Sequence, residues 1–283
     1  MSRVLVIDGQ TQVACDIGGA LSAAKLPMEY AAGHADALKR LRSHSFGVVI
    51  TGAHSVIEED LALLEEMRDI RPGVKCIVLA QHSTPDEVIA ALRARVFACF
   101  SPPFDAYDIA NLARRAASDN QWRDDIHVIS ARSGWVSVRV NCRIITAERL
   151  LSFAKELSRQ LPQDTREEMV QALREILLNA MEHGGAFNPE QVVDVTAVRT
   201  ARSMVFYLRD PGAGFRRETL THAATSDTDP AAHVRLRDQQ GMRPGGYGLL
   251  LAAGTVDELI YSEIGNEAIL IKYLDTPAEA NTK

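Results

Sequence analysis

Short apolar runs alternate with helix-length amphipathic segments through the first 120 residues of the chain. After the last run, Asp105 precedes a segment whose apolar residues recur every three or four positions, as in a helix with an aspartate cap. Repeated strand–helix units of this kind predict a doubly wound parallel sheet with crossover helices, an α/β domain. The runs that we expect to form strands are residues 3–7, 28–32, 47–51, 75–80 and 97–100.

The order and lengths of these segments resemble the receiver domain of two-component response regulators, a flavodoxin-like fold, over residues 1–120. Phosphorylation of a receiver requires an aspartate nucleophile beside acidic groups that hold magnesium. Asp8 is followed by glycine where receivers carry an acidic pair, and Gly52 stands at the phosphoacceptor position. Ala80 and Pro102 replace the hydroxyl residue and the lysine of that family. The sequence predicts a pseudo-receiver that docks or dimerises without being phosphorylated, with an active receiver as the alternative.

Charge and composition narrow the partners and the location of the chain. A formal net charge of -6 provides no general attraction to the phosphates of nucleic acids. The sequence contains no run of 18 apolar residues, and its first residues show no long apolar segment followed by a cleavage site. We therefore expect a cytoplasmic protein that binds neither nucleic acid nor membrane. The four cysteines lack zinc-ligand spacing, and we expect them to be reduced and structural.

The composition turns polar between Ala116 and Gly134, which indicates a domain boundary. An alternating run at residues 135–140 then predicts a strand, and Thr146 is expected to cap the helix that follows. The predicted division is a first domain at residues 1–120, a linker at 121–134, a second domain at 135–276 and a tail at 277–283.

A predicted helix at residues 165–183 carries polar residues in a stripe beside its apolar face. Glu175, Asn179 and His183 recur every four residues and therefore lie on one side of the helix. A solvated helix surface would give the same pattern, so the stripe alone is a weak signal.

Two glycine-rich clusters follow this helix in the sequence. After predicted strands at 192–199 and 203–209, Asp210 begins a cluster with Gly212 and Gly214, where the backbone can approach a planar ligand and the carboxylate can accept a hydrogen bond from an adenine amino group. A second cluster, residues 244–250, opens a helix, and such helix starts present free N–H groups to phosphates.

The ordered combination resembles the Bergerat-type, or GHKL, ATPase fold of gyrase, histidine kinases and mismatch-repair ATPases. The resemblance implies an α+β two-layer sandwich that binds ATP and Mg²⁺, in which Asn179 holds the magnesium ion, Asp210 binds adenine and residues 216–243 form a lid. Residues with a nucleotide-binding role by this resemblance are Asn179, Asp210, Gly212, Gly214, Gly245, Gly246, Gly248 and Leu249. His183 is a further candidate for a phosphate contact, with a structural hydrogen bond as the alternative. Arg243, the lid cation nearest the second glycine cluster, is another, with surface charge as the alternative.

Within that superfamily, the spacing of Glu175 four residues before Asn179 is most similar to the pattern of the anti-sigma-factor serine kinases. Those enzymes use the matching glutamate as a general base. The resemblance implies a serine/threonine protein kinase that phosphorylates an anti-sigma-factor antagonist of the STAS type, with a sigma factor as a second candidate partner. The alternative is a nucleotide-gated binding module that transfers no phosphate. Whether the chain is an enzyme and whether it forms a homodimer are left open at this point.

Overall fold

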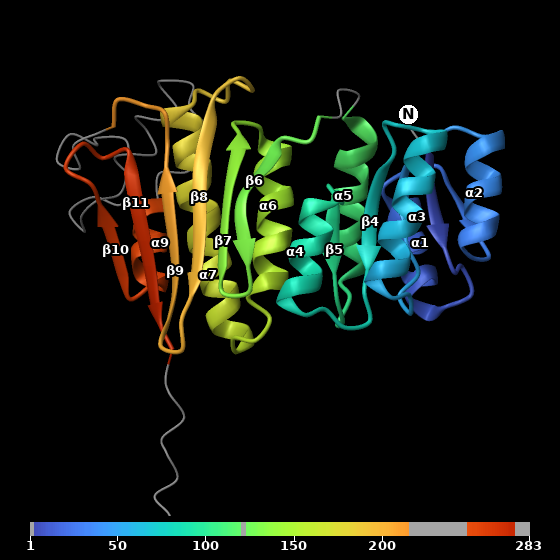
Figure 1. The fold of residues 1–283 in the computed structure, drawn as a ribbon, viewed down its shortest axis with the longest axis horizontal. Coiled ribbons are helices and arrows are strands. Elements are labelled where there is room, and N and C mark those ends of the chain that lie inside the picture. The colour runs from blue at the N-terminus through green and yellow to red at the C-terminus, as the bar shows by residue number, and fades with distance from the viewer. Residues whose placement is uncertain (1–2, 120–122, 215–247, 275–283) are drawn as a thin grey trace, which may run out of the picture. The chain divides into compact units, whose positions relative to one another are not determined.

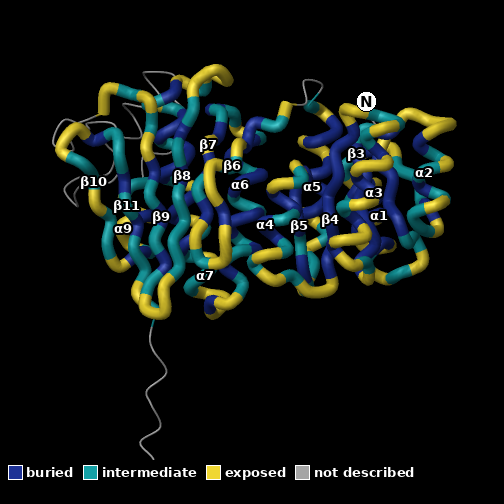
Figure 2. Tube along the Cα trace, in the orientation of Figure 1, coloured by how far each residue is buried: buried dark blue, intermediate teal, exposed yellow. Residues whose placement is uncertain are grey.

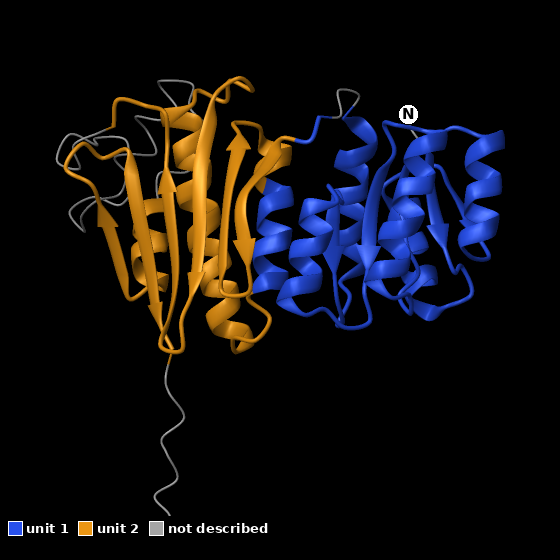
Figure 3. Ribbon diagram, in the orientation of Figure 1, with its two compact units in different colours: residues 1–124, 148–157 blue, residues 125–147, 158–283 orange. Residues whose placement is uncertain are grey.

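A computed structural model describes residues 3–119, 123–214 and 248–274 of the chain. The chain divides into two compact units (Figure 3). The first unit consists of residues 1–124 and 148–157, and the second consists of residues 125–147 and 158–283. None of the helices in the described ranges has both the length and the apolar character needed to cross a membrane.

The first unit is a parallel five-stranded sheet with helices between the strands (Figure 1). The strand order is β2-β1-β3-β4-β5, the doubly wound order of flavodoxin-like and receiver domains. The elements are β1 (Arg3–Ile7), α1 (Gln12–Ala23), β2 (Met28–Ala31), α2 (His34–Ser43), β3 (Phe46–Ile50), α3 (Ile57–Ile70), β4 (Lys75–Leu79), α4 (Pro85–Arg93), β5 (Ala98–Phe100) and α5 (Ala106–Ser118). The flavodoxin-like prediction is confirmed.

Burial explains why these segments become parallel strands. Every residue of β4 is buried, as a central strand covered on both faces requires (Figure 2). Helix α1 packs against α5, whereas α3 contacts α2 and α4. The predicted cap of α5 is also present, because Asp105 Oδ1 accepts hydrogen bonds from the backbone N–H groups of Tyr107 at 2.8 Å and Asp108 at 3.1 Å.

The second unit contains an antiparallel six-stranded sheet in the order β10-β11-β9-β8-β7-β6 (Figure 1). Its strands show the alternation of buried and exposed residues that a sheet with one covered face produces. They are β6 (Ile126–Arg132), β7 (Trp135–Asn141), β8 (Val192–Arg199), β9 (Ser203–Arg209), β10 (Glu258–Tyr261) and β11 (Glu267–Tyr273). Strands β8 and β9 have the predicted boundaries.

Helix α7 (Gln163–Asn179) covers this sheet and packs against β9, β11 and α9 (Gly248–Thr255). Its predicted apolar face is confirmed, since Met169, Leu173 and Ile176 are buried. The result is the predicted α+β two-layer sandwich.

Two predicted boundaries are wrong. Residues 126–132 of the predicted linker form β6, whose Ile126 and Ala131 are buried and which pairs with β7 along its length. Thr146 does not cap the next helix, α6, because that helix begins at Ile144. The hydroxyl of the buried Thr146 instead donates to Asp125 Oδ2 at 3.4 Å.

Helix α6 (Ile144–Leu157) is divided between the two units. Residues 144–147 belong to the second unit, and residues 148–157 belong by their contacts to the first unit. The predicted second domain at 135–276 therefore includes a segment that packs elsewhere.

Candidate functional site

The predicted polar stripe lies at the carboxyl end of α7. The Glu175 side chain is 13% exposed, and its Oε1 accepts hydrogen bonds from Gln171 Nε2 at 3.1 Å and Arg174 Nη1 at 3.2 Å. Asn179 is half-buried and is the last residue of the α-helix. The two side chains lie one helical turn apart, as the sequence predicts.

The helix does not continue to His183 in α-helical form. A π-helical turn, Ala180–Gly184, follows Asn179, and the Gly185 N–H donates to the Ala180 carbonyl at 3.0 Å. This wider turn ends the four-residue repeat, so the predicted α-helix at 165–183 is correct only as far as Asn179. His183 is exposed on the turn. Single π-helical turns of this kind occur frequently at functional sites.

Asp210 follows the last residue of β9 and is half-buried. Its Oδ1 accepts a hydrogen bond from the Gly212 N–H at 2.8 Å, and its own backbone N–H donates to the Asn266 carbonyl at 3.0 Å. Burial raises the pKa of the Asp210 carboxyl above its ordinary value, and the Gly212 hydrogen bond partly opposes this shift. Within the part of the chain that the structure describes, the Gly212 N–H is the hydrogen-bond donor to this carboxylate, which can accept a further hydrogen bond from a ligand.

The structure adds Gly184 and Gly185 to the site. A Cβ atom at Gly184 would overlap the carboxylate of Asp210, and a Cβ atom on Gly212 would lie 2.7 Å from Gly184 Cα. The π-helical turn and the start of the Asp210 cluster are therefore packed backbone against backbone. Sequence reasoning passed over this pair, although two adjacent glycines directly after a polar helix stripe are a visible signal of a close approach.

Helix α9 brings Gly248, a member of the second glycine cluster, beside Glu175. A Cβ atom on Gly248, the first residue of α9, would lie 2.6 Å from Glu175 Oε2. The helix start and the carboxylate are therefore neighbours. Leu249 follows on α9 and is half-buried. Gly214, the end of the first cluster, has a φ of 78° and lies against Ile264 in the β10–β11 connection.

Some predicted residues lie outside the described residues. These are Arg243, Gly245, Gly246 and the predicted lid at 216–243. The structure brings predicted residues together in two groups. Glu175 lies beside Gly248, and Asp210 lies beside Gly212 and the added Gly184.

This arrangement can recognise two chemically different ends of one ligand. The N-terminus of α9 offers backbone N–H groups and a positive dipole to an anion. Asp210 can accept a hydrogen bond from an amino group, and Glu175 beside the helix start can accept a proton from a hydroxyl group.

The first unit also has acidic residues near the carboxyl ends of its strands, but their surroundings differ from those of Asp210. A Cβ atom on Gly52 would lie 3.0 Å from Asp8 Cβ, so the predicted phosphoacceptor position is beside Asp8 but carries no side chain. Asp60, which sequence reasoning did not select, is fully buried nearby. Ser55 Oγ lies 2.7 Å from Asp60 Oδ2, and His34 Nε2 lies 3.3 Å from Asp60 Oδ1.

Comparison with solved structures finds receiver domains. The chain is similar to a CheY-like response regulator receiver domain protein from Methanospirillum hungatei JF-1, with 20% sequence identity, coverage of 42% of this chain and 95% of that chain, and a TM-score of 0.38. It is also similar to a response regulator from Thermotoga maritima, with 18% identity, coverage of 42% of this chain and 100% of that chain, and a TM-score of 0.38. The receiver-like fold of the first unit rests on its own strand order.

Comparison with curated proteins gives no match. Comparison with family models gives one match, to the histidine kinase-like ATPase domain, over residues 143–272. This range contains the π-helical turn, both carboxylates and the start of α9. The chain therefore contains a histidine kinase-like ATPase domain at residues 143–272.

Proposed function

We propose that the protein is an ATP-binding signalling kinase that transfers a phosphoryl group to a serine or threonine hydroxyl of a partner protein. The observation that carries this proposal is the position of Glu175, whose carboxylate lies against the first residue of α9. Phosphates bound at that helix start would place the transferable group beside a candidate general base.

The residues present fit a nucleotide. The half-buried Asp210 carboxylate accepts a hydrogen bond from the Gly212 N–H and lies beside the backbone of Gly184. Among the residues at 3–119, 123–214 and 248–274 this is its one backbone donor, so an acceptor remains for an adenine amino group. The eight-residue helix α9 supplies the anion-binding end.

Magnesium fits the same site through Asn179. An amide oxygen is a hard ligand, and Mg²⁺ commonly uses few protein ligands because it keeps water and binds substrate phosphates. The ion would supply neutralisation of phosphate charge there. Glu175 would meanwhile accept the proton of the attacking hydroxyl, and the hydrogen bonds from Gln171 and Arg174 would hold its carboxylate in place.

The proposed substrate is an anti-sigma-factor antagonist of the STAS type, by the resemblance of the Glu175–Asn179 spacing and the glycine clusters to anti-sigma-factor serine kinases. A sigma factor is the second partner of this proposal. The first unit, with Gly52 at the phosphoacceptor position, would act through protein contacts and not through its own phosphorylation.

The proposal is tested with labelled ATP, magnesium and candidate antagonist proteins from the same genome, followed by detection of phosphoserine or phosphothreonine. Glu175→Gln should keep ATP affinity close to wild type and slow transfer by about 10² to 10⁴, the usual contribution of a general base. Asp210→Asn should instead weaken ATP binding.

Glu190→Gln, an exposed glutamate on the same unit, serves as the matched control and should change neither quantity. If wild type binds ATP and no partner is phosphorylated, the protein is a nucleotide-gated binding module. If Glu175→Gln and Asp210→Asn both bind ATP as wild type does and transfer phosphate at the wild-type rate, the site is misplaced.

A further inference from the structure

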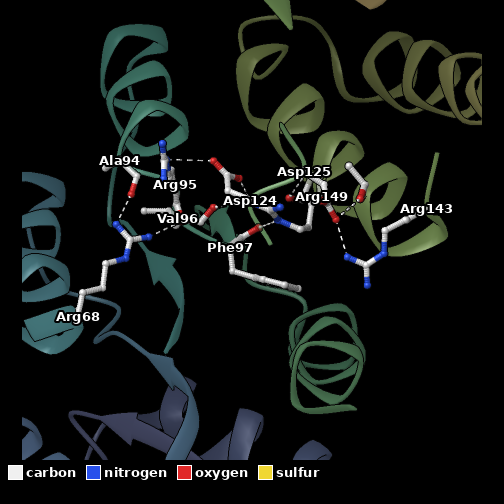
Figure 4. Close-up of polar contacts among 11 residues, drawn as sticks. Arg68, Ala94, Arg95, Val96, Phe97, Asp124, Asp125, Arg143 and Arg149 are labelled. Carbon is white, nitrogen blue, oxygen red and sulfur yellow. Dashed lines mark hydrogen bonds and ion pairs between the residues drawn. The ribbon is translucent and has the colours of Figure 1, made fainter. Parts of the chain in front are cut away.

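Helix α6 is held in the first unit by two buried charged side chains. Arg149 is 2% exposed, and its guanidinium donates to the Phe97 carbonyl at 3.1 Å and the Val96 carbonyl at 3.3 Å (Figure 4). It also lies 3.3 Å from Asp124 Oδ1. Val96 and Phe97 directly precede β5, the edge strand of the first sheet.

The second anchor is Glu156, at the other end of the same segment. Its side chain is buried, and its Oε2 accepts a hydrogen bond from Ser101 Oγ at 2.7 Å. Its Oε1 accepts one from the Ser101 N–H at 3.3 Å. Residues 148–157 are thus fixed at both ends of β5. Buried charges satisfied by several partners hold a segment in one position, because any shift leaves them unpaired.

The start of α6 is fixed within the second unit. Asp125 Oδ2 accepts hydrogen bonds from Arg143 and from the buried Thr146. The residue before Arg143 is Cys142, which is fully buried and whose N–H donates to the Gln191 carbonyl at 2.9 Å. One short segment therefore leads from the start of α6 to Cys142.

Cys142 lies directly under the π-helical turn of the candidate site. A Cβ atom at Gly185 would overlap Cys142 Sγ, just as one at Gly184 would overlap the Asp210 carboxylate. Burial, together with the negative charge of Asp210, raises the pKa of the Cys142 thiol to about 11. The thiol, the two glycines and the carboxylate thus form one packed series without a gap for side-chain rearrangement.

We propose that Cys142 is a positioning residue for Asp210 and that the packing of residues 148–157 in the first unit sets the nucleotide affinity of the second unit through α6. The inference rests on the proposed function in that Asp210 binds the nucleotide. Movement of α6 would shift Cys142, then the Gly184–Gly185 turn, and finally the carboxylate. The first unit would thereby regulate the site without phosphorylation.

The test is a double-mutant cycle on ATP affinity in the full chain. Glu156→Gln replaces an acceptor facing the Ser101 N–H, and Cys142→Ala removes the atom under the turn. Each should weaken ATP binding by roughly 3- to 10-fold, the size of a typical coupling effect. The double variant should have the same ATP affinity as the single variant that binds ATP less tightly, because both changes act on one series of contacts.

Two matched controls accompany the cycle. Lys155→Gln changes a partly exposed charge on the same helix, whose solvent-screened ion pair with Asp108 spans 3.7 Å and contributes little. Cys76→Ala removes a buried thiol from β4 of the first unit. Both should leave ATP affinity unchanged. If Glu156→Gln fails to fold, Ser101→Ala removes the same hydrogen bond without altering α6.

A second readout does not depend on ATP. The Gly185 N–H and the Phe187 N–H, which donate to the Ala180 and Met181 carbonyls, should exchange with solvent faster in Glu156→Gln than in wild type. A wild-type protein that binds no ATP would refute the proposed function, and the exchange rates would still test the coupling. Folded variants with wild-type exchange, or fold-changes that simply multiply in the double variant, would overturn the inference.

Discussion

Both units have polar groups near the carboxyl ends of strands, but the groups that surround them differ between the two units. In the first unit, Asp8 lies beside the glycine at position 52. The buried Asp60 carboxylate nearby accepts a hydrogen bond from Ser55 on Oδ2, and its Oδ1 lies 3.3 Å from His34 Nε2 without a hydrogen bond. In the second unit, Asp210 has one backbone donor and Glu175 faces a helix start.

The difference contrasts a fully buried carboxylate in the first unit with a half-buried carboxylate beside glycines in the second. The Asp60 side chain is fully buried in its own unit, and its hydrogen bond from Ser55 contributes to stability. Asp210 is only half-buried, and the backbone of Gly184 and Gly212 lies close to its carboxylate. A recognisable fold does not by itself assign a function, so the proposed ligand role of Asp210 rests on the burial and contacts of its carboxylate.

Of the changes that test this comparison, Gly184→Ala should have the largest effect, a loss of ATP affinity. The added methyl group has no room beside the Asp210 carboxylate and should displace it. Loss of a hydrogen bond to a charged group predicts ATP binding about 10- to 100-fold weaker, measured by titration calorimetry. Gly254→Ala in α9, where a methyl group would meet no atom within 4 Å, is the control and should bind normally. Equal affinity in the two variants would mean that Asp210 does not contact the nucleotide.

The next effect concerns the first unit and should appear in stability, not in binding. Ser55→Ala removes the hydroxyl 2.7 Å from the buried Asp60 carboxylate, which should lower the free energy of unfolding by about 1–3 kcal/mol. Urea denaturation measures this change. Ser118→Ala, an exposed serine of α5, should change it by less than about 0.5 kcal/mol. A reduced ATP affinity in folded Ser55→Ala would contradict the assignment of this cluster to the fold.

A smaller effect is expected from pH. The pKa of Asp210 is raised by burial, so its carboxyl begins to protonate at a pH above the ordinary aspartate range. The protonated group accepts a hydrogen bond from adenine less well, and ATP affinity should fall as the pH decreases through that raised pKa. In Asp210→Asn, the decrease in ATP affinity that protonation of Asp210 causes at low pH should be absent. An unchanged profile in that variant would place the titration elsewhere.

The last prediction is that acetyl phosphate leaves the mass of the protein unchanged. Incubation of wild-type protein with acetyl phosphate and magnesium should add no phosphate, because Gly52 provides no carboxylate at the phosphoacceptor position. Intact mass measures the product. One added phosphate located within the first unit would remove the contrast between the two units and make the first an active receiver.

The sequence by itself determined both fold classes and most of the candidate site. Apolar runs followed by amphipathic segments specify a parallel sheet because both faces of each strand must be covered. The spacing of Glu175 and Asn179 placed them one helical turn apart, since side-chain direction on a helix is periodic. The Asp210 cluster was visible because aspartate and glycine after a strand serve few other purposes than turns and close approaches.

Only the tertiary structure decided three features. The polar residues within 118–125 predict a linker at 121–134, and the assignment of β6 within that range depends on its pairing with β7. The π-helical turn depends on contacts of Gly184 and Gly185 with Asp210 and Cys142, which are distant in sequence. The placement of residues 148–157 with the first unit depends on Arg149 and Glu156 finding buried partners there. Local periodicity predicts a helix, but the partners that satisfy a buried charge are fixed only when the chain has folded.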